Sequence, residues 1–230
     1  RELGGHRVQV EERVAERFNA RVMALWPYGP QMFYCSSDVE GLEDLAGKKV
    51  RSFTPTMSAL LEWLGASPVT LQFAEVYPAL QRGVADCALT SATSGNTGNW
   101  PEVTKNLMPL GVSWSMQGHF MNLDSWNRLS PEAQEKISAA FEDLETQYWD
   151  MARELSQMAV NCNVGKQPCE GYVEYDMTLV EPSESDREKL HQAVTAVVLP
   201  TWGEACDSSM SGCSEIWNAT VGAAHGLSID

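Results

Sequence analysis

Residues 44–89 read DLAGKKVRSFTPTMSALLEWLGASPVTLQFAEVYPALQRGVADCAL, and this stretch decides the predicted fold. Short apolar runs at 50–53, 69–71 and 84–89 have the length of buried strands. A longer run with helical spacing lies between each pair of strands, and a glycine follows each of these runs. Strands and helices that alternate at such short intervals predict a layered α/β domain.

Similar patterns continue on both sides of this stretch. Upstream, an amphipathic helix and two short strands are expected, with a proline-rich turn between the strands. In order along the chain, the expected elements are a helix over 8–19, strands over 20–25 and 32–35 with the turn at 26–30, helices over 56–64 and 73–81, a polar loop over 90–99, strands over 114–122 and 172–180, and helices over 184–198 and 214–224.

Residues 131–160 predict one helix of unusual length. Ser130 is a suitable N-cap, Pro131 fits the first turn, and apolar residues recur at helical spacing without an internal glycine or proline. A helix of about 30 residues is ~45 Å long. Since that length exceeds one small domain, we expect the helix to contact two lobes.

The charge balance excludes some classes of partner. The chain carries 16 Lys and Arg against 31 Asp and Glu, a formal net charge of −15. Such a surface repels phosphate backbones and anionic headgroups, so nucleic acid and anionic membranes are not expected as partners. No run approaches the ~20 apolar residues of a membrane span. An anionic ligand would need positive charge concentrated at one place.

The six cysteines suggest an oxidising compartment. Cys162 and Cys169 flank NVGKQP, and Cys206 and Cys213 flank DSSMSG, so two pairs share a short spacing around turn residues. This pattern predicts two local disulfides and a location outside the cytosol. Four free cysteines with a coincidental spacing are the alternative. For Cys35 and Cys87, which make up the remaining pair, spacing does not decide whether they are bonded.

Three blocks of sequence carry a family resemblance. They are DLAGKKVR at 44–51, LGASPV at 64–69 and FAEVYPALQRGVAD at 73–86. Their order and spacing resemble the DctP-type substrate-binding proteins of tripartite ATP-independent periplasmic (TRAP) transporters. LDSWNRLSPE at 123–132, before the long helix, and EIWN at 215–218 extend the resemblance.

The resemblance implies an α/β fold of the two-lobed periplasmic-binding-protein clamp type, with a long helix spanning both lobes. Residues 1–30 would then be the remainder of a first lobe and a crossover, and the family's N-terminal portion would be missing. Residues 31–122 would form a second α/β lobe with the ligand-binding arginine. Residues 123–230 would supply the spanning helix and elements that return to both lobes.

The implied function is that of a periplasmic solute-binding protein. It would capture a small organic acid anion, a carboxylate, and deliver it to the membrane subunits of a TRAP transporter, without spanning the membrane itself and without a cofactor. The ligand-binding domain of an extracellular sensor is the alternative on the same architecture, and a secreted hydrolase is a further one.

Arg51 is the strongest candidate for a ligand-binding residue. In the family, the arginine that closes this strand forms a salt bridge to the ligand carboxylate. A planar guanidinium offers parallel N–H donors that match a carboxylate, and it would supply the local positive charge. The alternative is a surface arginine on an edge strand, or one that pairs with an acid of the chain.

Three neutral side chains are further candidates. The run after Asp86 departs from the sialic-acid-type pattern, because Thr90 stands where an asparagine would contact the ligand. Gln31 lies near the position of a second arginine. Thr90, Ser91 and Gln31 can donate neutral hydrogen bonds to a ligand, or they can be ordinary solvated loop residues. These departures mean that no substrate identity transfers.

Four aromatic side chains complete the predicted site. Trp26, Phe73, Trp100 and Trp114 fall near strand ends or in the loops that follow them, where α/β clamps bind ligands. They could line a pocket for an aromatic acid, or hold an onium group while Arg51 takes the carboxylate. Packing in a core is the alternative for each tryptophan.

The sequence lacks the common catalytic signatures. Its four histidines are scattered, and it contains no HExxH, GxSxG or P-loop pattern. We therefore expect a binding protein and no enzyme, with no metal site. Whether a metal bridges the ligand is a question that the sequence leaves open.

Overall fold

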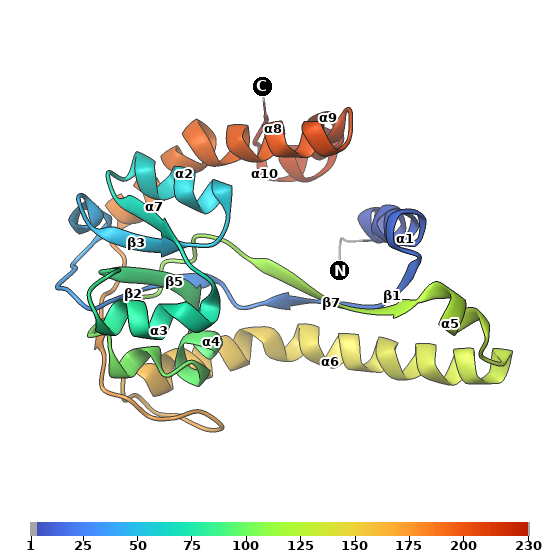
Figure 1. Ribbon diagram of the computed structural model, residues 1–230, viewed down its shortest axis with the longest axis horizontal. Coiled ribbons are helices and arrows are strands. Elements are labelled where there is room, and N and C mark those ends of the chain that lie inside the picture. Colours follow the sequence, from blue (N-terminus) through green and yellow to red (C-terminus); the bar gives the residue numbers. More distant parts are fainter. Residues whose placement is uncertain (1–3, 230) are drawn as a thin grey trace. The chain divides into compact units, whose positions relative to one another are not determined.

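The computed structural model describes residues 4–229, and the chain divides into two compact units. Unit 1 comprises Arg1–Gly29 and Ser113–Ser156, and unit 2 comprises Pro30–Val112 and Gln157–Asp230. The elements of both are labelled in Figure 1. The predicted division at residues 30 and 122 stays a prediction.

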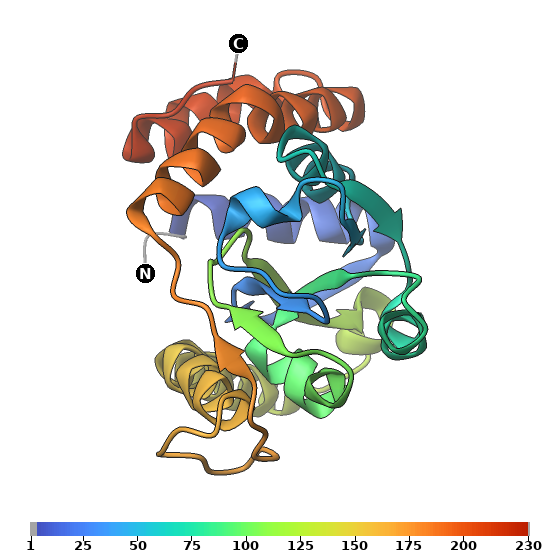
Figure 2. The ribbon, with the colours of Figure 1, turned by 90° about the vertical axis from the view of Figure 1, so that its left-hand side faces the viewer.

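Unit 2 is built on a six-stranded mixed sheet with the strand order β4-β3-β5-β2-β6-β8. β3 is parallel to β4 and β5, whereas β2 is antiparallel to β5 and β6. Figure 2 shows the strands of this sheet after a turn of 90° from the view of Figure 1. The strands are β2 (Gln31–Cys35), β3 (Lys49–Ser52), β4 (Ser67–Thr70), β5 (Cys87–Ser91), β6 (Asn106–Met108) and β8 (Thr178–Leu179).

Helices cover both faces of this sheet. α2 (Pro55–Trp63) joins β3 to β4, and α3 (Phe73–Gln81) leads from β4 past β3 to β5. These two crossovers run in opposite directions along the sheet, so right-handed connections place their helices on opposite faces. The core residues agree, because Leu61 of α2 and Val76 of α3 belong to different buried clusters. The α/β layering predicted from residues 44–89 is thereby confirmed.

Unit 2 contains further helices, which irregular segments connect. Its helices are η1 (Leu42–Leu45), α4 (Ala92–Thr97), η2 (Trp100–Glu102), α7 (Glu184–Ala193), η3 (Val194–Val198), α8 (Leu199–Ser209), α9 (Cys213–Trp217), η4 (Asn218–Gly222) and α10 (Ala223–His225), of which η3 and η4 are π-helical. The helices predicted over 184–198 and 214–224 are therefore present.

Three local predictions were wrong. The polar loop over 90–99 contains α4, because the Ser91 hydroxyl accepts a hydrogen bond from the Ser94 amide and caps a helix. The strand predicted over 172–180 is reduced to β8 and one bridge at Asp176. The turn predicted at 26–30 is instead the end of a strand that runs to Tyr28.

Unit 1 contains a two-stranded antiparallel sheet and three helices, one of which continues into unit 2. β1 (Ala20–Tyr28) pairs with β7 (Ser115–Asn122), with an irregular register between Val22 and Ala24. Pro27 is tolerated in β1 because a two-stranded sheet leaves each strand one unpaired edge. The helices are α1 (Gly4–Phe18), α5 (Leu123–Asn127) and α6 (Pro131–Asn163).

α6 is a single helix of 33 residues, as predicted. The Ser130 hydroxyl accepts a hydrogen bond from the Ala133 amide at its start, which confirms the N-cap. Within unit 1, Glu145 accepts from the Leu25 amide and Trp149 donates to the Leu25 carbonyl. Within unit 2, Ala159 lies in a core cluster. The helix therefore contributes to both units.

All six cysteines form disulfides. Cys162–Cys169 links the last turn of α6 to the segment after it, and Cys206–Cys213 joins α8 to α9, as the spacing predicted. The third bond, Cys35–Cys87, links residues that face each other on β2 and β5, with a Cα–Cα distance of 4.0 Å. Three disulfides in one chain are typical of proteins that fold outside the cytosol.

A buried polar network ties the end of α6 to the sheet of unit 2. The Asn163 amide donates to the Tyr34 hydroxyl at 2.7 Å and accepts from Asn96 at 2.8 Å. Asn96 also exchanges two hydrogen bonds with the backbone of Val173. Burial raises the pKa of Tyr34, so its hydroxyl keeps its proton and donates to the Ala92 carbonyl.

Candidate functional site

The candidate site lies in unit 2, at the carboxyl ends of the parallel strands β3, β4 and β5. Arg51 is the third residue of β3 and pairs in register with Val69 of β4 and Ala88 of β5. Ligands commonly bind at this edge of an open α/β sheet, because connections that leave neighbouring strands toward opposite faces of the sheet open a crevice there. The Arg51 residue is only 4% exposed, so it is not a surface arginine.

Backbone carbonyls hold the Arg51 guanidinium in place. Its Nε donates to the Leu71 carbonyl at 3.1 Å, and its Nη1 donates to the Leu89 carbonyl at 2.8 Å. Among the residues that the structure describes, no acidic side chain forms an ion pair with it. Burial lowers the pKa of Arg51 to about 10, which leaves it charged at neutral pH.

This arrangement leaves hydrogen-bonding capacity for an anion. A guanidinium has five N–H donors, and the two carbonyls use one each, so three have no acceptor within the described part of the chain. A buried cation without a counter-ion is costly unless a ligand supplies one. The geometry therefore suits the binding of a carboxylate.

A carboxylate on α3 fixes one of the two carbonyls. Glu75 accepts a hydrogen bond from the Gln72 amide at 2.9 Å. That amide belongs to the same peptide group as the Leu71 carbonyl, which accepts from Arg51. The N–H and C=O of a trans peptide point in opposite directions, so Glu75 and Arg51 bind its two ends. Each hydrogen bond polarises the peptide in favour of the other.

We expect Glu75→Ala to weaken carboxylate binding through this peptide. Coupling of this kind is worth roughly 3–10-fold in affinity. Glu75→Gln keeps an acceptor for the Gln72 amide and should restore most of the loss. Ser183→Ala is the control, because Ser183 is the N-cap of the capping box of α7 and forms no hydrogen bond with Arg51. Titration calorimetry and thermal unfolding should show equal destabilisation but an affinity change for Glu75→Ala alone.

Aromatic rings surround Arg51. The Phe53 ring centroid lies 4.7 Å from its guanidinium carbon, and the Trp100 ring lies at 5.9 Å. Phe73 stacks on Trp100 with the centroids 5.2 Å apart. The structure thus brings together the predicted residues Arg51, Phe73 and Trp100, and Trp100 is fully buried. Phe53 was not predicted from the sequence. It follows Arg51 by two positions, and the alternation of side chains along a strand places both on the same face of the sheet.

The predicted neutral residues lie on the adjoining strands. Gln31 pairs in register with Ser91, and Thr90 pairs with Met32. Gln31, Thr90 and Ser91 are all buried. The Ser91 hydroxyl is bonded to the Thr93 hydroxyl at 2.9 Å and caps α4, so it has a structural role as well. Contact between these three residues and a ligand stays a prediction.

The other two predicted residues belong to unit 1. Trp26 packs against the rings of Tyr148 and His119, with centroid distances of 4.9 and 4.7 Å. Trp114 is 66% exposed and lies just before β7. A role of Trp26 or Trp114 in ligand binding stays a prediction.

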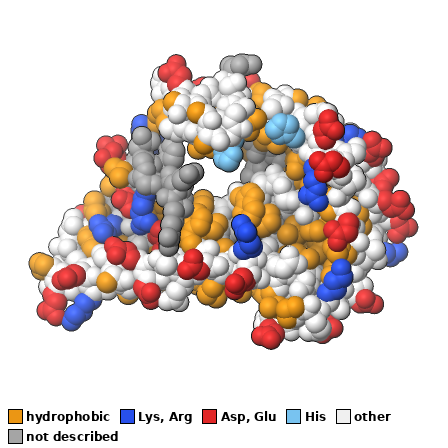
Figure 3. Space-filling model, turned by 180° about the vertical axis from the view of Figure 1, so that it is seen from behind, with side chains coloured by type: hydrophobic (Ala, Val, Ile, Leu, Met, Phe, Trp, Pro, Cys, Tyr) orange, Lys and Arg blue, Asp and Glu red, His pale blue; other side chains and the backbone are white. Residues whose placement is uncertain are grey.

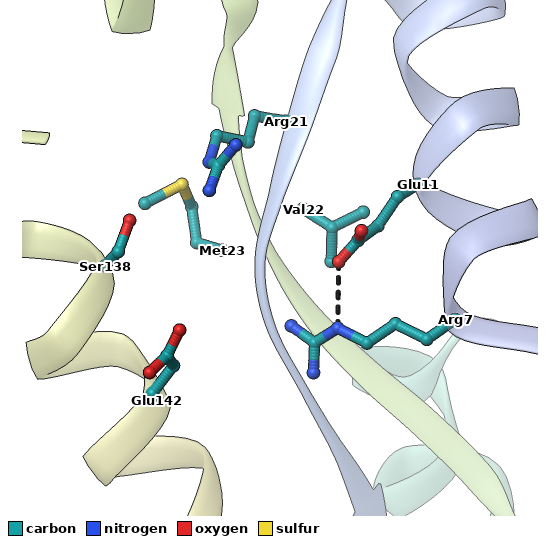
Figure 4. A pocket seen from close by; sticks show the side chains of 7 residues that line it. All are labelled: Arg7, Glu11, Arg21, Val22, Met23, Ser138 and Glu142. Carbon is teal, nitrogen blue, oxygen red and sulfur yellow. Dashed lines mark hydrogen bonds and ion pairs between the residues drawn. The ribbon is translucent and has the colours of Figure 1, made fainter. Parts of the chain in front are cut away.

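A hollow of about 440 Å³ lies within unit 1. Figure 4 shows its lining residues, which are Arg7, Glu11, Arg21, Val22, Met23, Ser138 and Glu142. Arg7 forms ion pairs with Glu11 and Glu145, and the Arg21 guanidinium lies over the Trp126 ring at 4.4 Å. Because Arg7 already has two acidic partners and the lining includes Glu11 and Glu142, this hollow is less suited to an anion than the surroundings of Arg51.

The described residues show neither a metal-ligand cluster nor a membrane-spanning element. No group of three or more His, Cys, Asp or Glu side chains between residues 4 and 229 could hold a metal ion. No helix in that range is long and apolar enough to cross a membrane. Acidic side chains are scattered over the face shown in Figure 3, rather than gathered in one patch.

The comparison with known families agrees with the fold and with the sequence motifs. Residues 4–202 match the DctP family, described as "Bacterial extracellular solute-binding protein, family 7". The chain belongs to this family. Its relatives in the DctP family are solute-binding proteins. The resemblance inferred from the three sequence blocks is confirmed.

Two curated relatives illustrate the similarity. The uncharacterized protein YiiZ of Salmonella typhimurium is 30% identical over 142 residues, which is 57% of this chain and 42% of YiiZ. The ectoine-binding periplasmic protein TeaA of Halomonas elongata is 28% identical over 120 residues, which is 52% of this chain and 35% of TeaA. The alignments thus cover less than half of each of these relatives.

Solved structures of TRAP solute-binding proteins share the fold. A TRAP periplasmic solute-binding protein from Desulfovibrio salexigens, with bound orotic acid, has a TM-score of 0.80 at 17% identity, covering 95% of this chain and 68% of that one. The ectoine-binding protein of the TeaABC transporter of Halomonas elongata has a TM-score of 0.76 at 19% identity, covering 94% and 67%. The predicted two-lobed α/β class is confirmed by these matches.

Proposed function

We propose that this chain is part of an extracytoplasmic solute-binding protein that captures a small organic acid by its carboxylate. The observation that carries the proposal is the buried guanidinium of Arg51, which has no acidic partner among the described residues and keeps three unused N–H donors. The family provides independent support, since its solved members include proteins with bound malonate and β-D-galacturonate.

The proposed ligand is delivered to the membrane subunits of a TRAP transporter in the periplasm. The names of several relatives support this assignment, because they are TRAP or periplasmic binding proteins. The three disulfides fit an oxidising compartment. The net charge of −15 makes a local cation such as Arg51 the natural point of attachment for an anion.

The residues around Arg51 are suited to holding a ligand rather than converting it. The Ser91 hydroxyl is bonded to Thr93 and to the Ser94 amide, instead of to a histidine or a carboxylate that could act as a base. Phe53, Phe73 and Trp100 contribute aromatic rings. We therefore assign binding without turnover and no cofactor, in preference to a secreted hydrolase.

Mass spectrometry under non-denaturing conditions tests the proposal directly. Protein purified from its source should carry a small organic acid, and the acid released by unfolding should bind again unchanged. Prolonged incubation of the protein with that acid should leave it intact. Recovery of a neutral or basic compound, or conversion of the acid into a product, would contradict the proposed function.

A further inference from the structure

Two phenylalanines near Arg51 are partly exposed. Phe53 is 41% exposed and Phe73 is 44% exposed, whereas Phe33, Tyr34 and Trp100 in the same unit are fully buried. Leaving large apolar surface in water is unfavourable, and covering it with an apolar ligand surface recovers free energy in proportion to the area. A ligand with an apolar surface would therefore bind more tightly if it covered these two rings.

These rings form a continuous set of contacts with the anion-binding group. Phe53 approaches the Arg51 guanidinium from the position just after β3, and Trp100 approaches it from η2. Phe73, the first residue of α3, extends the set by stacking on Trp100 with an interplanar angle of 25°. A carboxylate bound to Arg51 would thus have aromatic surface in its immediate surroundings, where flat groups pack well.

The charges of this edge suit one carboxylate but not two. Arg51 is the one cationic side chain that the described contacts of the site include. Glu75 adds a negative charge to this edge, because it lies in the first turn of α3 and accepts a hydrogen bond from the peptide group that holds Arg51. A second carboxylate would have no cation there and would be repelled by Glu75.

We propose that Phe53 and Phe73 are specificity-determining residues, which select a singly charged acid whose carboxylate is attached to a flat ring. The proposal rests on the proposed function, because Arg51 must bind the carboxylate. It goes further in naming the carbon skeleton and the number of negative charges. An open-chain acid lacks the flat surface. A ring with two carboxylates would bring its second negative charge close to Glu75, where the described contacts include no further cation to pair with it.

Three probes separate these features in a calorimetric titration. Benzoate has one carboxylate on a ring, phthalate has two on the same ring, and propionate has one without a ring. We expect benzoate to bind about 10-fold more tightly than either of the others. Burial of a ring face favours benzoate over propionate by about that factor in affinity, and the cost of an unpaired charge disfavours phthalate by about the same factor.

Phe53→Leu tests the role of the ring itself. Leucine keeps an apolar side chain but not a flat face, so the preference for benzoate over propionate should shrink by about 3–10-fold. Trp63→Leu is the matched control, because Trp63 is 37% exposed on α2 and has no described ring contact with the site. It should leave the preference unchanged.

The outcomes distinguish this inference from the proposed function. If the acids bind, and binding depends on Arg51, but phthalate or propionate equals benzoate, then the specificity proposal is wrong and the function stands. If Phe53→Leu weakens the binding of benzoate and propionate equally, the specificity proposal is likewise wrong and the function stands. If none of the three probes binds while the acid recovered from the protein does, the specificity proposal is wrong and the function stands. If that recovered acid does not bind either, the proposed function fails and this inference fails with it. If binding persists in Arg51→Ala, the anion site lies elsewhere and this inference fails.

Discussion

Arg51→Ala is expected to weaken binding of the carboxylate ligand by at least ~10–100-fold. Charge-assisted hydrogen bonds contribute roughly 1.5–3 kcal/mol, and each 1.4 kcal/mol corresponds to about a factor of ten in affinity. The loss also includes the cost of burying the carboxylate without its partner. Calorimetric titration of the wild type and the variant with the ligand recovered from the protein measures the effect.

Arg51→Lys should lose much of the same affinity. An ammonium offers a point charge and cannot bind the Leu71 and Leu89 carbonyls while presenting parallel donors to a carboxylate. Both variants leave these carbonyls without their charged donor, so we expect some loss of stability as well. Circular dichroism and a melting curve establish that the fold is retained. Unchanged affinity in a folded Arg51→Ala protein would place the anion site elsewhere.

Loss of the Cys35–Cys87 disulfide should have the largest effect on stability. The bond closes a segment with a sequence separation of 52, against 7 for each of the other two bonds. In the chain-entropy account, replacing both cysteines by alanine costs about 4 kcal/mol for the long loop and about 2.5 kcal/mol for a short one. Both Cys35 and Cys87 are also buried, so the alanines lose packing contacts.

Denaturant unfolding of two double variants decides this prediction. Cys206→Ala with Cys213→Ala is the control, because it removes a bond of short loop length from the same unit. The midpoint should fall clearly further for the Cys35 and Cys87 variant. Equal losses would mean that loop length does not govern the contribution of these bonds.

The sequence predicted those parts of the fold that depend on local pattern. Helical spacing without glycine or proline was sufficient for α6, and turn residues between paired cysteines were sufficient for two disulfides. The Cys35–Cys87 bond was beyond such reasoning, because it depends on the antiparallel register of β2 and β5. Non-local strand pairing leaves no mark in the spacing of two residues.

The candidate site was predicted unevenly for a related reason. Arg51 was found because its surrounding motif resembles a family, and its burial follows from the strands on both sides of it. Phe53 was missed because an aromatic residue after a strand is more often part of a core. The α4 helix was missed because its composition is typical of a loop, and only the Ser91 cap reveals it.

The hydrogen bonds among Tyr34, Asn96 and Asn163 bear on the order in which unit 2 folds. Tyr34 and Asn163 are 129 positions apart, and β6 acquires its second partner strand, β8, only when Thr178 docks. Closing a loop of that length loses chain entropy before the contacts at its ends can compensate, so such contacts form late in folding. Until they form, the face of the sheet under α6 is open to water. The unit that carries Arg51 therefore completes its core late, although the pairs of β3 with β4 and β5 join residues that are closer in sequence.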